Sequence, residues 1–168
     1  TQPNSEQRSE TLGTIRCLCG ACSVTVADNQ ARCYVRCGCN DCRQFAQYTH
    51  LKGGVSPVSL PRLFYFKSDI LAVQGKENIK GLKLRAGGAS TRLCCKNCYS
   101  VLAVDHPSHW GNVFLMLPDY CSHDCDLTRP LSAYINMSEF CTEEDTKWEP
   151  CVPLFESFRF RRQRMQYN

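Results

Sequence analysis

Half of the 14 cysteines in this 168-residue chain lie in three short stretches: Cys17-Leu18-Cys19-Gly20, Cys37-Gly38-Cys39-Asn40-Asp41-Cys42-Arg43 and Cys95-Lys96-Asn97-Cys98. Cysteine at about 8% of residues indicates a disulfide-stabilised protein or a metal protein. A chain of this length buries roughly two thirds of the surface that it exposes when unfolded, so it does not need disulfides. In a reducing compartment, tightly spaced cysteines indicate metal ligands. We therefore expect zinc sites built from these seven cysteines.

The first and third stretches each supply half of a metal site. Structural zinc takes four ligands in tetrahedral geometry, and a C-x-x-C turn places two thiolates at the spacing that one ion accepts. Joined in space, Cys17, Cys19, Cys95 and Cys98 would complete one four-thiolate site. Such a site would couple metal binding to folding.

The middle stretch offers three thiols, Cys37, Cys39 and Cys42, and no obvious fourth ligand nearby. Catalytic zinc keeps three protein ligands and one open position. A three-thiolate site is suited to an incoming sulfur ligand, which predicts chemistry that makes or breaks a carbon–sulfur bond. Two alternatives remain: a second closed site completed by a spare cysteine, and a redox C-x-x-C pair, for which the surrounding βαβ pattern is missing.

The rest of the chain indicates a mainly β protein. Short runs of β-branched and aromatic residues alternate with turn residues, and no stretch shows a helical apolar period over more than two turns. Single helical turns are expected after Cys42 and near Ser138 to Glu144. The expected strands cover residues 23–27, 33–36, 63–67, 70–74, 79–85, 101–105, 113–117 and 132–137. No linker or repeat divides the chain, so we expect a flexible arm at residues 1–12 and one domain at 13–168.

Charge and hydropathy limit the partners and the compartment. The net charge of +4 is modest, and much of the excess lies in the closing run Arg159, Arg161, Arg162 and Arg164. We expect this run to be solvated and do not expect a nucleic acid partner. Thr1 to Glu10 has no signal-peptide pattern, and no apolar run approaches the roughly 20 residues of a membrane span. We expect the cytoplasm, with the nucleus as the alternative.

The three cysteine motifs, in this order, resemble the glutathione-dependent formaldehyde-activating enzyme family, which also includes centromere protein V. The resemblance covers about Gly13 to Trp148. It implies a β-tent fold of the Mss type held by two zinc ions, and a glutathione adduct as substrate. By the same resemblance, Cys17, Cys19, Cys95 and Cys98 hold a structural zinc, and Cys37, Cys39 and Cys42 hold a catalytic zinc.

The chain departs from the family pattern at three places. Gly38 stands where members often carry His, and Tyr99-Ser100 stands where they often carry Gly-Thr. The stretch Leu115 to Asp119 differs from the usual Gly-x-Leu-Asp and is followed by an unusual insert, Tyr120 to Leu127. These departures leave the zinc motifs intact and indicate a specialised member with its own substrate.

Several further residues are candidates for the site. Arg43 is the predicted glutathione-binding residue, and Arg92 and Lys96 also lie beside ligand cysteines and could hold carboxylates. Charge balance around anionic zinc sites explains all three equally well. Any of His50, His106, His109 and His123 could act as a general acid or base. Trp110, Trp148 and Phe64-Tyr65-Phe66 are expected to pack in the core rather than to line a pocket.

The remaining cysteines are expected to play no chemical role. Cys121 and Cys125 could bind a third metal, although incidental thiols of a surface loop are the favoured reading. The others, expected to be small buried apolar residues, are Cys22, Cys33, Cys94, Cys141 and Cys151.

The leading hypothesis is a carbon–sulfur lyase or synthase that acts on glutathione or a glutathione conjugate, from the S-hydroxymethylglutathione type to a larger metabolite adduct. The first rival is a non-catalytic zinc-binding module that contacts chromatin or another acidic partner. The second is a metal or redox sensor that uses the surplus thiols.

Overall fold

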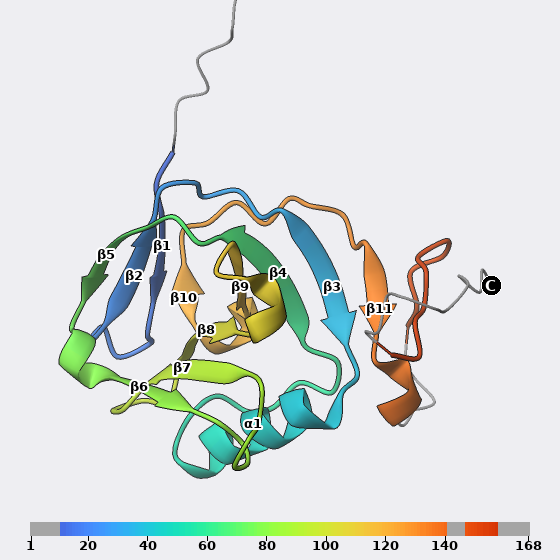
Figure 1. Ribbon diagram of the computed structural model, residues 1–168, viewed down its shortest axis with the longest axis horizontal. Helices are drawn as coiled ribbons and strands as arrows, with labels where there is room; N and C mark the ends of the chain where they lie inside the picture. The colour runs from blue at the N-terminus through green and yellow to red at the C-terminus, as the bar shows by residue number, and fades with distance from the viewer. Residues whose placement is uncertain (1–10, 141–146, 158–168) are drawn as a thin grey trace, which may run out of the picture.

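A computed structural model describes residues 11–140 and 147–157 of the chain, which fold mainly into β-strands (Figure 1). The strands are β1 (Gly13–Arg16), β2 (Ser23–Val26), β3 (Cys33–Cys37), β4 (Arg62–Lys67), β5 (Ile70–Gln74), β6 (Ile79–Leu82), β7 (Thr91–Cys95), β8 (Val101–Asp105), β9 (Val113–Met116), β10 (Ser122–His123) and β11 (Ala133–Ile135). The helices are α1 (Asn40–Leu51) and the 3-10 turns η1 (Lys76–Asn78), η2 (Pro107–His109), η3 (Pro118–Tyr120) and η4 (Met137–Glu139). The mainly β expectation is confirmed.

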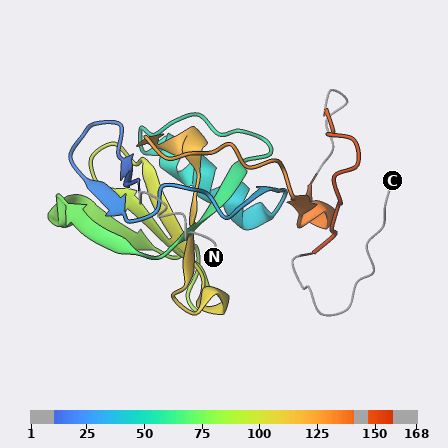
Figure 2. The same ribbon diagram turned by 90° about the horizontal axis from the view of Figure 1, so that it is seen from above.

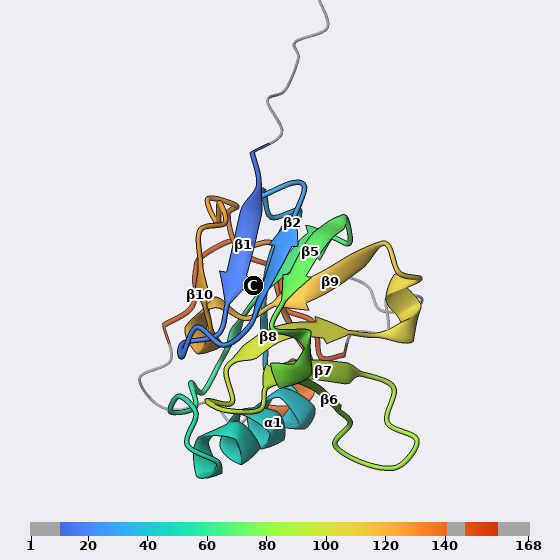
Figure 3. The same ribbon diagram turned by 90° about the vertical axis from the view of Figure 1, so that its left-hand side faces the viewer.

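The smaller sheet has the strand order β10-β1-β2-β5 and is antiparallel throughout. Strand β2 alternates as the sequence predicts: Val24 and Val26 point into the core, and the residues between them are half-buried. Strand β5 lies at the edge of the sheet and is exposed along its whole length, including Ile70, Leu71 and Val73. Figure 3 views the molecule from the side on which β1, β2 and β5 lie.

The larger sheet has the order β11-β3-β4-β9-β8-β7-β6. Its pairs are antiparallel except for β11, which runs parallel to β3. Strand β8 is buried at four successive residues, Val101 to Val104, which means that both of its faces are covered. Such continuous burial explains why its sequence is an apolar run rather than an alternating one.

Two apolar clusters cover the two faces of the larger sheet. The first lies between the sheets and contains Ile15 and Val26 together with Phe64 and Phe66. The second lies between the larger sheet and α1 and contains Phe45, Leu63 and Val101. Figures 1 and 3 both show α1 running beneath β6 and β7.

The three-turn helix α1 corrects the expectation of only a single turn after Cys42. Its buried residues are Phe45, Ala46 and Thr49, and the rest of the helix is polar or partly exposed. So narrow an apolar stripe gives almost no helical period in the sequence, and tertiary packing stabilises the helix instead. The turn expected near residues 138–144 is present as η4, while residues 141–146 lie outside the described part.

The end of the described chain returns to the larger sheet. One backbone hydrogen bond joins Phe155 to β11, with the Phe155 N–H donating to the Tyr134 carbonyl at 2.8 Å. Figures 1 and 2 place residues 147–157 at the end of the molecule opposite β5. The expected arm at residues 1–12 and the closing arginine run fall outside the described residues, apart from Thr11, which pairs with Asn29, and Leu12.

Candidate metal centres and the cavity beside one of them

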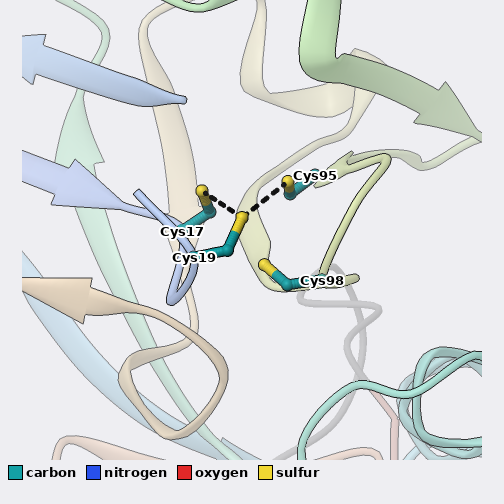
Figure 4. Close-up of side chains that lie close together, drawn as sticks. All are labelled: Cys17, Cys19, Cys95 and Cys98. Carbon is teal, nitrogen blue, oxygen red and sulfur yellow. Dashed lines mark hydrogen bonds between the residues drawn. The ribbon is translucent and has the colours of Figure 1, made fainter. Parts of the chain in front are cut away.

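Cys17, Cys19, Cys95 and Cys98 come together as predicted (Figure 4), and we call them the four-cysteine group. The turn after β1 carries the first pair, and the turn between β7 and β8 carries the second. The Sγ of Cys19 lies 3.5 Å from that of Cys17 and 3.7 Å from that of Cys95, and all four sulfurs lie within 4.8 Å of one another. Tetrahedral zinc with Zn–S bonds of about 2.3 Å needs sulfurs about 3.8 Å apart, so the group fits such an ion.

Backbone and hydroxyl donors support the sulfurs of the four-cysteine group. The Cys22 N–H donates to the Cys17 Sγ at 3.2 Å, and the Asn97 N–H donates to the Cys95 Sγ at 3.4 Å. Buried Ser100 links the two turns, because its Oγ lies 3.1 Å from the Cys98 Sγ and accepts the Leu18 N–H at 2.9 Å. Burial acts to raise the pKa of Cys98, but the bonds from Ser100 and Cys19 together outweigh it and lower this pKa to about 6.

Each turn of the four-cysteine group ends in a residue with left-handed backbone. Gly20 has φ 76°, where glycine is at no disadvantage, whereas Tyr99 has φ 55°, which is costly for a bulky residue. The Tyr99 ring is held between Tyr48, 6.2 Å away edge to face, and Lys80, whose Nζ lies 4.0 Å from the ring centroid. These contacts hold a tyrosine where the resembled family often has glycine.

The three-cysteine group consists of Cys37, Cys39 and Cys42, whose sulfurs also lie within 4.8 Å of one another. Cys37 ends β3, and Cys39 is the N-cap of α1, where its Sγ accepts the Cys42 N–H at 3.3 Å. Asn136, just after β11, donates from its Nδ2 to the Cys37 Sγ at 3.2 Å. The positive end of the helix dipole and these donors stabilise negative charge on the sulfurs. A cysteine must be a thiolate to bind a metal ion, so the position suits metal ligands.

Hydrogen bonds inside the three-cysteine group give its members different pKa values. Bonds from Cys39 and Cys42 lower the pKa of Cys37 to about 3, and the same interaction with Cys37 raises the pKa of Cys39 to about 11. The pKa of Cys42 is raised for the same reason. One thiolate therefore holds two thiols as donors, and a cation that bound all three would release two protons.

Gly38 leaves no room for a side chain between the first two cysteines of this group. A Cβ at this position would lie 2.7 Å from the Phe140 Cβ and 3.1 Å from the Asn136 carbonyl oxygen. The His that the resembled family often carries here is therefore excluded unless η4 moves. This departure in sequence has a local packing cause.

A cavity of about 480 Å³ opens beside the three-cysteine group. This volume lies within the range of small-molecule sites. The four-cysteine group lines neither this cavity nor a second one, which Asn40, Arg43 and Pro57 help to line. The polar residues that line the cavity, besides the three cysteines, are Asp41, Tyr65, Arg85, Ser90, Arg92, His106, Ser108, His109, Tyr120, Asn136 and Glu139.

Two arginines and one carboxylate form one part of the cavity wall. Arg85 pairs with Asp41 at 2.8 Å, whereas Arg92 reaches only to 4.0 Å from the second oxygen of Asp41. The Arg92 side chain is 6% exposed, and its guanidinium lies over the Phe45 ring at 5.3 Å. A buried guanidinium without a close anion favours an anionic ligand in the cavity.

The structure separates the other candidate residues. Arg43 does not line the cavity: it donates to the Glu139 carbonyl at 2.9 Å and to the Asn40 side chain. Lys96 donates to the Glu77 carbonyl at 2.5 Å. Of the histidines, His106 and His109 line the cavity, whereas His50 and His123 do not.

The aromatic expectations hold in part. Phe64 and Phe66 are core residues, and Tyr65 packs against the second cluster while it also lines the cavity, but Trp110 is 85% exposed, so its core assignment is wrong. Trp148 contacts Tyr134 edge to face at 4.8 Å and lies outside the cavity.

The spare cysteines also differ from expectation. Cys121 and Cys125 are buried rather than exposed in a surface loop, and burial raises the pKa of each to about 12. They form no metal-binding group with other described residues. Cys22 and Cys94 are buried as expected, Cys33 is half-buried, Cys151 is exposed, and Cys141 lies outside the described part. None of the described cysteines is paired in a disulfide.

Several residues of the cavity carry no signal in the sequence. Asn136 and Arg85 belong to no motif, Asp41 is notable in sequence only as a spacer between ligands, and Tyr65 stands out only as part of an aromatic run. They meet the three-cysteine group because β11, β4 and the loop after β6 converge on it. No family model matches this chain, and no curated protein matches it. None of the described helices combines the length and apolar character needed to span a membrane.

Proposed function

We propose that this protein is a zinc-dependent carbon–sulfur lyase or synthase that acts on glutathione or a glutathione conjugate. The domain would have the β-tent fold of the formaldehyde-activating enzyme family that its cysteine motifs resemble. One observation supports this most: the three-cysteine group, which leaves a fourth ligand position open, borders a cavity of ligand size.

The two groups take different roles in this proposal. The four-cysteine group would hold a structural zinc that joins the turns after β1 and β7. The three-cysteine group would hold the second zinc, which when bound stabilises a substrate sulfur as a thiolate. Asn136 keeps the Cys37 sulfur oriented, and Arg92 offers its guanidinium to a carboxylate of glutathione.

The volume of the cavity indicates how large the electrophile joined to glutathione could be. Glutathione adducts of formaldehyde add only one carbon to the thiol, and a cavity of about 480 Å³ has room for a larger group. Apolar side chains such as Leu63, Val104 and Leu115 form part of its lining. These features favour a hemithioacetal or thioether of a larger organic electrophile. The cytoplasm, with its reducing conditions and abundant glutathione, is the compartment that suits this reaction.

The rival function is a zinc module that binds chromatin or another acidic partner. Its basic contact would be the arginine run at residues 159–164, outside the described residues. The cavity and its buried Arg92 have no use in that role, which is why we favour the enzyme.

Metal content and turnover, measured together, test the proposed function. We expect two zinc ions per chain in the wild type and about one in Cys39→Ser, with loss of hemithioacetal cleavage. Cys33→Ser is the matched control, because Cys33 lies on the same strand as Cys37 and outside both groups. Two zinc ions together with no cleavage of any glutathione hemithioacetal would favour the zinc module.

A further inference from the structure

His109 occupies an unusual place in the cavity wall. Its side chain is only 8% exposed, and its Nδ1 is sealed from solvent without a hydrogen-bond partner among the described residues. The closest anion is a carboxylate oxygen of Asp105, 3.9 Å from Nδ1. Its Nε2 is not sealed in this way, and His109 is one of the residues that line the cavity.

One aromatic residue of the cavity wall contacts His109 directly. The Tyr65 ring contacts the His109 ring edge to face, with centroids 5.7 Å apart. Burial raises the pKa of Tyr65, and the nearby Cys33, Cys37 and Cys42 thiols raise it further. Tyr65 therefore stays protonated, and His109, Tyr65 and the three cysteines line the same cavity.

The surroundings of His109 keep its imidazole neutral near pH 7. Burial lowers its pKa below 6.5, the neighbouring His106 lowers it further, and Asp105 opposes both. His106 and Asp105 belong to the same β8–β9 connection, and Tyr65 is the titratable group that faces His109 from β4. A neutral imidazole with a free nitrogen can accept a proton.

We propose that His109 is the general base of this cavity and acts on the hydroxyl group of a glutathione hemithioacetal. This inference rests on the proposed carbon–sulfur chemistry. The hydroxyl proton moves to Nε2, the O–H electron pair becomes the second bond of an aldehyde C=O, and the C–S bond breaks with its electron pair on sulfur. In the reverse direction the imidazolium returns the proton to the carbonyl oxygen as the thiolate adds to carbon.

The other polar residues of the cavity are less suited to this step. The Nδ1 of His106 already accepts from the Ser108 hydroxyl at 2.7 Å and from the Ser108 N–H at 3.0 Å. Asp41 is paired with Arg85, and Glu139 accepts the Asn40 N–H at 2.6 Å. The pKa values of Tyr65 and Tyr120 are raised, so neither hydroxyl is a base at neutral pH.

The test compares wild type with His109→Gln across pH 5 to 9, using the hemithioacetal of glutathione and a small aldehyde. The matched control is His123→Gln, since His123 also has a sealed, unpartnered Nδ1 but lies outside the cavity. We expect kcat to fall by about 10²- to 10⁴-fold in His109→Gln, the usual range for a lost general base. The limb of the pH–rate profile that falls below pH 6.5 should disappear as well.

Four further measurements separate catalysis from structure. S-methylglutathione has no hydroxyl proton, so its dissociation constant should be the same in wild type and His109→Gln, as should the zinc content. His109→Ala should regain activity when imidazole is added, because the vacated space opens on the cavity. Direct NMR titration of the His109 ring in wild type should give a pKa below 6.5.

The outcomes distinguish this inference from the function on which it rests. Wild-type cleavage with equal rates in His109→Gln and His123→Gln would overturn the role of His109 and leave the carbon–sulfur function intact. Loss of zinc or of S-methylglutathione binding in His109→Gln would also overturn it, in favour of a structural role. A wild type that neither cleaves hemithioacetals nor binds S-methylglutathione would remove the proposed function and this inference together.

Discussion

At the scale of single residues, Arg92 is the side chain whose surroundings most call for a ligand. It is buried, lies over Phe45, and has no anion within 3.5 Å among the described residues. We expect Arg92→Met to raise the dissociation constant of S-methylglutathione by about 10- to 100-fold, since a hydrogen bond to a charged group contributes about 1.5–3 kcal/mol. Calorimetric titration measures this constant directly.

Arg43→Met is the control for that experiment, because Arg43 stands beside the ligand Cys42 in sequence but outside the cavity. We expect the dissociation constant of S-methylglutathione for Arg43→Met to equal that of the wild type. A loss of binding in Arg43→Met with none in Arg92→Met would restore the sequence-based assignment of Arg43 as the glutathione-binding residue.

Asp124 gives a pH dependence with a defined sign. Burial acts to raise its pKa, but the Thr14 N–H at 2.6 Å and the Arg16 guanidinium at 2.8 Å outweigh this and hold the pKa below 3.8. The folded state therefore binds fewer protons than the unfolded state just below that pH, and the free energy of unfolding falls as pH falls through this window. In urea denaturation, Asp124→Asn should be less stable than wild type by at most about 1 kcal/mol near neutral pH, since the pair is half exposed. The difference should vanish under strongly acidic conditions; a constant difference at all pH values would contradict the assignment.

At the scale of elements, helix α1 connects the three-cysteine group to the core. Phe45 is 2% exposed, packs in the cluster beneath the larger sheet, and supports Arg92 from below. We expect Phe45→Ala to lower the free energy of unfolding by about 3–5 kcal/mol, as large-to-small core changes do. Gln44→Ala, one residue earlier on the exposed face, should stay within about 0.5 kcal/mol of wild type. Equal effects of the two changes would mean that α1 does not pack as described.

The elements also show which features the sequence could predict. Strand β8 was expected at Val101–Asp105 and β5 at Ile70–Gln74, and both are observed with these bounds. Strands β1 and β7 were missed, because a four-residue strand with one strongly apolar residue and a strand ending in two cysteines carry little β signal. Helix α1 was expected to be only a single turn. Just one narrow face of it is buried, so its sequence shows little apolar periodicity.

In the candidate site, too, some features could be predicted from the sequence and others could not. The ligand sets were predictable because each half-site is a local motif, in which spacing along the chain determines distance in space. The cavity was not predictable, since its contacts span long separations: Asn136 and Cys37 are 99 residues apart, and Arg85 and Asp41 are 44 apart. No local pattern encodes such pairs.

At the scale of the whole molecule, the four-cysteine group joins the two sheets. The turn after β1 belongs to the smaller sheet, and the turn after β7 belongs to the larger one. We expect a strong zinc chelator, or Cys98→Ser, to lower the melting temperature by about 8–16 °C. This follows from about 4 kcal/mol of linked binding energy at 1,000 times the dissociation constant, with about 2–4 °C per kcal/mol in a chain of this size.

Cys151→Ser is the control for the melting experiment, because Cys151 is an exposed thiol in neither group. Its melting temperature, followed by circular dichroism at fixed zinc concentration, should equal that of the wild type. An unchanged melting temperature in Cys98→Ser would show that the four-cysteine group does not hold the sheets together.

The separation of the two turns also sets an order of events in time. Cys19 and Cys95 are 76 residues apart. At synthesis rates of about 5–20 residues per second, about 4–15 s pass between the appearance of the first turn and that of its partner on the ribosome. During this interval the Cys17–Cys19 turn supplies only two of the four cysteines, so the four-cysteine group beside β2 is incomplete. The first strands of the protein must therefore wait for the second half of the chain before the four-cysteine group beside them can assemble.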